Sequence, residues 1–89
     1  MRLVFQPSAK HNADTYREHD AALWAELRKV LVAIRDQTPR ARDTRLDVLG
    51  GTAWLVNVHV PGRDEAYQVV WAPSADDVAD VVHLGPRLS

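Results

Sequence analysis

The chain has 89 residues, of which 46% are apolar, with no cysteine and a formal net charge of −1. This length supports one domain over residues 1–89, the lack of cysteine excludes disulfides and thiolate chemistry, and the near-neutral charge argues against a strongly electrostatic nucleic-acid binder. No apolar run could serve as a signal peptide or a membrane span, so we expect a cytoplasmic protein without membrane contact.

The first elements of the chain are predicted to be a strand and a mostly polar helix. Apolar side chains favour a strand over residues 2–6, which Pro7 ends. Ser8 is the expected N-cap of the helix, because its hydroxyl can accept from a backbone N–H of the first turn. The apolar positions of this helix are Ala9, Ala13 and Tyr16, which form a narrow stripe.

A second, more strongly amphipathic helix follows. Asp20 is its expected N-cap, and the helix should end near Gln37 because Pro39 disfavours helical geometry at Thr38. Its apolar residues recur at helical spacing and make one broad face. They are Leu23, Leu27, Val30, Leu31 and Ile34. The spacing is compatible both with one bent continuous helix and with a helical hairpin.

The second half of the chain is predicted to form strands, because apolar residues alternate there instead of following a helical period. A polar connector with three arginines, residues 39–45, precedes them. The strands are expected over residues 46–49, 54–60, 67–71 and 78–84, separated by glycine- or proline-containing turns. Short turns between consecutive strands predict an antiparallel meander. We therefore expect an α+β fold, in which an N-terminal strand and a helical hairpin pack on an antiparallel sheet.

Three segments of the chain resemble the RelE/ParE superfamily of toxins from bacterial type II toxin–antitoxin systems. They are Trp-Leu-Val-Asn-Val-His-Val at residues 54–60, Tyr-Gln-Val-Val-Trp at 67–71 and Val-Val-His-Leu-Gly-Pro-Arg at 81–87. The second is similar to the family's usual Tyr-Arg-Val-Val-Tyr. The third is similar to an apolar strand followed by His-Ile-Gly and a basic residue. The resemblance covers nearly the whole chain in length and element order.

This resemblance implies a RelE-like fold and a toxin neutralised by a cognate antitoxin protein. Ribosome-dependent members cut messenger RNA in the ribosomal A site, whereas others inhibit DNA gyrase and lack the nuclease residues. We expect no cofactor, because arginine can supply the positive charge that a metal would bring. We also expect no metal site, since the four histidines lack ligand spacing.

The predicted catalytic residues are His83 and Arg87, which lie where the resemblance puts catalytic basic residues. Cleavage by the 2′-hydroxyl needs a base, an acid and a cation for the developing phosphorane charge. Histidine titrates near neutrality and can transfer a proton, and arginine can hold a phosphate with two donors. The alternative is that His83 is a solvated strand residue and Arg87 a solvated tail residue.

Four further residues are candidates for RNA or phosphate binding. Asn57 and His59 share one face of a predicted strand, Arg63 lies in the following loop, and Arg45 belongs to the polar connector together with Arg40 and Arg42. The alternative for each is a solvated surface position. Tyr67, Trp71 and Trp54 are large β-formers and are expected in the core.

Three departures from the nuclease pattern leave a second function open. Gln68 stands where the resemblance expects arginine, the family's C-terminal tyrosine is missing, and so are the lysines expected on the central strand. A metal-independent endoribonuclease that inhibits translation is the function that we expect first. A gyrase inhibitor, an antitoxin-binding relative without catalysis, and an interaction module without a toxin role are the alternatives.

Overall fold

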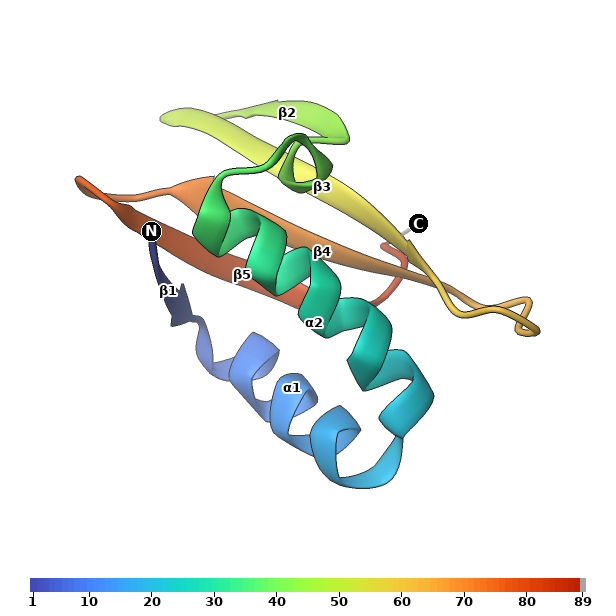
Figure 1. The fold of residues 1–89 in the computed structure, drawn as a ribbon. Coiled ribbons are helices and arrows are strands. Elements are labelled where there is room, and N and C mark those ends of the chain that lie inside the picture. The colour runs from blue at the N-terminus through green and yellow to red at the C-terminus, as the bar shows by residue number, and fades with distance from the viewer. Residues whose placement is uncertain (89) are drawn as a thin grey trace.

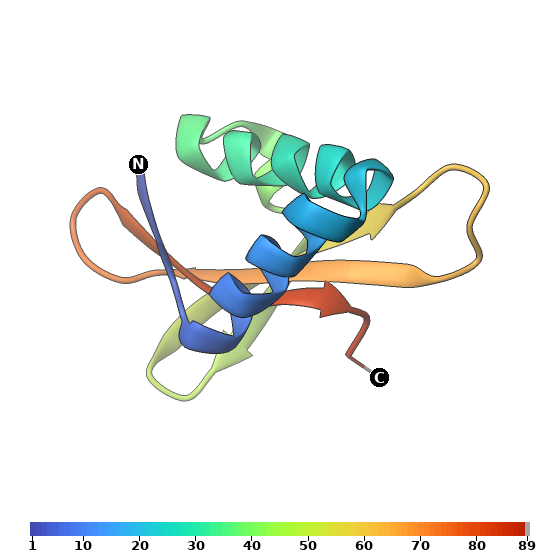
Figure 2. The same ribbon diagram turned by 90° about the horizontal axis from the view of Figure 1, so that it is seen from below.

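The computed structural model describes residues 1–88 and places two helices on one face of a five-stranded sheet (Figures 1 and 2). The elements are β1 (Arg2–Phe5), α1 (Pro7–His19), α2 (Ala21–Asp36), the 3₁₀ helix η1 (Pro39–Ala41), β2 (Thr44–Val48), β3 (Gly51–His59), β4 (Ala66–Pro73) and β5 (Val78–Pro86). This arrangement confirms the predicted α+β fold.

The strands lie in the order β1-β5-β4-β3-β2. The last four form the predicted antiparallel meander, and β4 is the middle strand of the five-stranded sheet. β1 instead runs parallel to β5, in a register from Arg2 opposite Val78 to Phe5 opposite Val81. The sheet is therefore mixed, and α1 and α2 carry the chain from one edge of it to the other (Figure 1).

Helix α1 begins two residues earlier than predicted, and the assignment of Ser8 as its N-cap is wrong. The N-cap is Gln6, whose side chain makes no capping hydrogen bond, and Pro7 is the first helical residue. Proline suits that position because its φ is already helical and its missing N–H would have no helical partner there. Ala9 and Ala13 are buried, as the apolar stripe predicts.

The two helices form a hairpin that breaks at Asp20. This residue has an extended φ of −144°, and its carboxylate accepts from the backbone N–H of Leu23 at 3.3 Å, which confirms its predicted role as N-cap. Helix α2 ends where expected, because Gln37 takes the left-handed conformation with φ of 59°. The hairpin directs the apolar face of α2 onto the sheet.

Strand β2 begins two residues before, and ends one residue before, the predicted strand over 46–49. It begins at Thr44, within the expected connector, and ends at Val48, so that Leu49 lies in the turn and is fully exposed. The register explains both ends, since Thr44 pairs with Leu55 and Val48 with Gly51. Leu49 and Gly50 are then the two turn residues.

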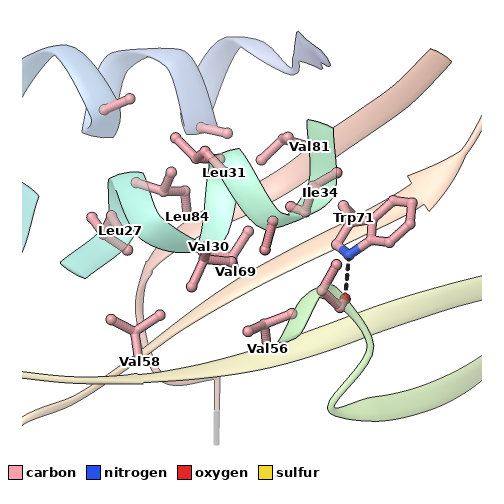
Figure 3. Packing of buried hydrophobic residues seen from close by; sticks show 14 of the residues in the cluster. Leu27, Val30, Leu31, Ile34, Val56, Val58, Val69, Trp71, Val81 and Leu84 are labelled. Atoms are coloured by element: carbon pink, nitrogen blue, oxygen red, sulfur yellow. Dashed lines mark hydrogen bonds between the residues drawn. The ribbon is translucent and has the colours of Figure 1, made fainter. Parts of the chain in front are cut away.

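The core lies between α2 and the central strands (Figure 3). Its largest fully buried side chain is Trp71 on β4, whose indole Nε1 donates to the carbonyl oxygen of Ala41 at 2.8 Å. The other large buried residues are Leu23, Leu27, Val30, Ile34, Val56, Val69, Val81 and Leu84. Tyr67 and Trp54 are partly buried against this cluster. Within residues 1–88, neither helix combines the length and the apolar character that crossing a membrane requires.

Replacing Trp71 with phenylalanine tests how much the indole hydrogen bond contributes. The change leaves a buried carbonyl at Ala41 without its donor and opens space in the core, so Trp71→Phe should lower the free energy of unfolding by about 1–3 kcal/mol. Urea-induced unfolding measures it. The control is Trp24→Phe at a half-buried position on α2, where a smaller loss is expected. Equal losses in the two variants would contradict this account.

Candidate functional site

A cleft of about 420 Å³ lies where the β3–β4 loop, the end of β3 and the residue after β5 meet. Three of the sequence-predicted site residues line it: Asn57, His59 and Arg87. The remaining lining residues are Glu26, Arg40, Val58, Asp64, Glu65, Ala66 and Tyr67. Arg45, Arg63 and His83 do not line this cleft.

Strand pairing brings His59 and Arg87 together across β4. His59 on β3 pairs with Ala66 on β4. On the other side of Ala66, its carbonyl oxygen accepts from the backbone N–H of Arg87 at 2.9 Å. His59 and Arg87 are 28 positions apart in the sequence, but both are neighbours of Ala66 and both line the cleft.

His83 lies apart from this group. It is opposite Val70 on β4, is half-buried, and one of its ring nitrogens lies 2.9 Å from the carbonyl oxygen of Pro86. The imidazole of His83 therefore contacts Pro86, the last residue of its own strand, β5. The histidine that shares the cleft with Arg87 is His59, and the sequence offered no way to choose between the two.

Arg40 is a cleft residue that sequence reasoning mentioned only as part of the connector. One guanidinium nitrogen contacts Asp43 at 2.7 Å, and the other donates to the carbonyl oxygen of Asn57, also at 2.7 Å. The carboxylate of Asp43 accepts in turn from the backbone N–H of Asn57 at 3.3 Å. Asn57 lies on β3 just beyond the residue that pairs with the first residue of β2. Arg40 and Asp43 therefore hydrogen-bond the carbonyl and the N–H of Asn57 in the way that a neighbouring strand would.

Arg63 is bound by Asp20 in a two-pronged ion pair. Its two terminal nitrogens donate to the two carboxylate oxygens, each at 2.8 Å, and so attach the β3–β4 loop to the turn between α1 and α2. The hydrogen bonds from Arg63 hold the pKa of Asp20 below its ordinary value. The same contact raises the pKa of Arg63.

The other connector arginines are also engaged. Arg45 pairs with Asp47 at 3.0 Å on the exposed surface of β2. Arg42 donates to the side-chain oxygen of Gln37, and its guanidinium carbon lies 5.6 Å from the ring centre of Trp54. At this distance the cation and the ring attract each other.

The cleft contains charges of both signs. Glu26, Asp64 and Glu65 line it together with Arg40, Arg87 and His59. Glu26 is paired with Lys29 at 3.1 Å, whereas Arg87 forms no ion pair within residues 1–88. Gln68, where the resemblance expects arginine, contributes no charge. A ligand with several phosphates would meet carboxylates here, and carboxylates oppose its binding.

Comparison with known proteins identifies a shared fold. No protein-family model matches the sequence, and no curated protein matches it. Among solved structures, a YoeB/ParE toxin from Agrobacterium tumefaciens matches with a TM-score of 0.67 and 16% sequence identity. The match covers 99% of this chain and 100% of that one. The chain therefore has the fold of this toxin from end to end, and the fold expected from the RelE/ParE resemblance is confirmed.

The pairing of Asp20 with Arg63 predicts a pH-dependent stability. Because the carboxyl pKa is lowered in the folded state, the pair stabilises the protein above the unfolded pKa of about 4 and loses this effect as the pH falls through the folded pKa. Asp20→Asn, which keeps a capping oxygen, should lower the urea midpoint at pH 7, and its difference from the wild type should shrink at pH 3.

Asp14→Asn is the matched control, because Asp14 forms exposed ion pairs with Lys10 and Arg17 on α1. Exposed pairs contribute little to stability, so its midpoint should stay close to that of the wild type at pH 7. A gap between Asp20→Asn and the wild type that is unchanged between pH 7 and pH 3 would refute the role of the pair.

Proposed function

We propose that this chain is the toxin component of a type II toxin–antitoxin pair and that a cognate antitoxin neutralises it. The observation that carries the proposal is the end-to-end likeness in fold to a YoeB/ParE toxin. The match covers 99% of this chain and all of that toxin. A fold can host unrelated functions, so the cleft provides the second line of support.

We infer that the toxin acts by binding a protein target rather than by cutting RNA, with DNA gyrase as the candidate. Phosphodiester cleavage needs cations that are available to the scissile phosphate. Arg40, Arg45 and Arg63 are all occupied by carboxylates at 3.0 Å or less. With carboxylates in the cleft as well, the charge balance favours a partner of mixed charge over a polyanion.

A ribosome-dependent endoribonuclease is the second candidate, supported by the joint presence of His59 and Arg87 in one cleft. In such a reaction a histidine would transfer the proton, and Arg87 would hold the scissile phosphate. This pairing substitutes His59 for His83 in the catalytic role that the sequence suggested.

Controlled expression in a bacterial host tests the toxin proposal. The wild-type chain should arrest growth, and co-expression of the neighbouring antitoxin gene should restore it. Arg87→Ala should relieve the arrest, because it removes the guanidinium of the cleft that forms no ion pair within residues 1–88. Arg28→Ala, on the exposed face of α2, is the matched control and should remain toxic. Unimpeded growth with the wild-type chain at a verified protein level would refute the toxin role.

A ribosome-bound cleavage assay separates the two modes of action. With purified ribosomes and a programmed messenger RNA, we expect the transcript to stay intact, while purified gyrase should lose supercoiling activity on addition of the protein. Transcripts cut in the A site by the wild-type chain and left intact by His59→Gln would instead establish the nuclease candidate and overturn the binding-only mode.

A further inference from the structure

Gln68 is the one polar side chain classed as buried within residues 1–88, with 4% of its surface exposed. It lies on β4 directly opposite Asn57 on β3 and Gly85 on β5. Burying a primary amide is costly unless both its ends are hydrogen-bonded. Both ends of Gln68 are.

The two hydrogen bonds of Gln68 join β3 to the residues that follow β5. Its Nε2 donates to the side-chain oxygen of Asn57 at 3.2 Å, and its Oε1 accepts from the backbone N–H of Leu88 at 3.1 Å. Because a backbone N–H can only donate, the oxygen of the amide must face Leu88. This fixes which way the amide points, and Nε2 then faces Asn57.

The contact with Leu88 constrains Arg87 from its C-terminal side. From the N-terminal side, the backbone N–H of Arg87 is held by the carbonyl oxygen of Ala66 at 2.9 Å. The peptide units on both sides of the Arg87 α-carbon are thus attached to β4, one through the strand backbone and one through Gln68. Two fixed peptide planes restrict the direction of the side chain between them. That side chain lines the cleft.

We propose that Gln68 is a positioning residue, which holds the backbone of Arg87 so that its guanidinium faces the cleft. This inference rests on the proposed function, in which the cleft contacts the target. An amide is suited to the task because it offers a donor to Asn57 and an acceptor to Leu88 at once. A lysine, arginine or leucine at this position would have no acceptor for the Leu88 N–H.

The test measures amide hydrogen exchange of Arg87 by NMR in the purified full chain. Gln68→Met keeps the side-chain length and removes both hydrogen bonds. Leu88→Pro removes the N–H donor, leaves Gln68 in place and also favours extended backbone at Arg87. Each should speed exchange of the Arg87 amide by about three- to tenfold, because its own bond to Ala66 opens more readily once the next peptide unit has lost a hydrogen bond. The double variant should exchange no faster than Gln68→Met alone, since Leu88→Pro breaks a contact that Gln68→Met has already removed.

Leu88→Ala is the matched control, because it removes an exposed side chain and keeps the N–H. Its Arg87 amide should exchange at the wild-type rate. If Gln68→Met does not fold, the Arg87 exchange rates of Leu88→Pro and Leu88→Ala are compared instead, because Leu88 is exposed and its replacement leaves the core intact. Wild-type exchange in folded Gln68→Met or in Leu88→Pro would overturn the proposal.

Growth arrest supplies the functional readout. Gln68→Met and Leu88→Pro should weaken toxicity toward the level of Arg87→Ala, and the double variant of Gln68→Met and Arg87→Ala should be as toxic as Arg87→Ala alone. Full toxicity of both variants beside a harmless Arg87→Ala would overturn the positioning role. If the wild-type chain is harmless, the proposed function fails, and the exchange rates still decide whether Gln68 holds Arg87.

Discussion

The buried hydrogen bond from the indole of Trp71 to the carbonyl of Ala41 is the contact on which the arrangement of the site depends. It joins the centre of the sheet to η1, the short link between α2 and β2 (Figure 3). Separating a buried donor from its acceptor without replacing the hydrogen bond costs free energy, so this bond holds η1 against the sheet. Held there, the chain enters β2 beside β3, and Arg40 and Asp43 reach the backbone of Asn57.

Much of the positive charge that the sequence offered for a nuclease is used inside the protein. Arg63 fastens a loop to the helical hairpin through Asp20, and Arg40 completes the exposed edge of β3 with Asp43. A carboxylate that neutralises an arginine weakens the attraction of that arginine for a phosphate, even though other N–H donors of the guanidinium remain. Among the described residues, Arg87 is the site candidate whose guanidinium forms no ion pair, and the hydrogen bonds of its two neighbouring peptide units go to the backbone of Ala66 and to Gln68.

The fold and the cleft are two separate kinds of evidence about function: the first concerns the path of the backbone, and the second concerns the side chains. The likeness to a YoeB/ParE toxin concerns the course of the chain, at an identity of 16% that leaves most side chains different. The cleft contributes the local features: charges of both signs, one histidine, and one arginine that forms no ion pair among residues 1–88. These features suit recognition of a folded partner, in which both signs of charge find complements.

The sequence alone determined the elements, because local periodicity reports which face of a helix or strand is apolar. It identified the α2 stripe, the cap at Asp20, the four meander strands and the core position of Trp71. Proline at the first helical position overrode the serine cap, and the parallel pairing of β1 with β5 had no local signature. Tertiary structure decided which charges meet. Asp20 and Arg63 are 43 residues apart, and no spacing rule relates two side chains that lie together only because separate elements pack on one sheet.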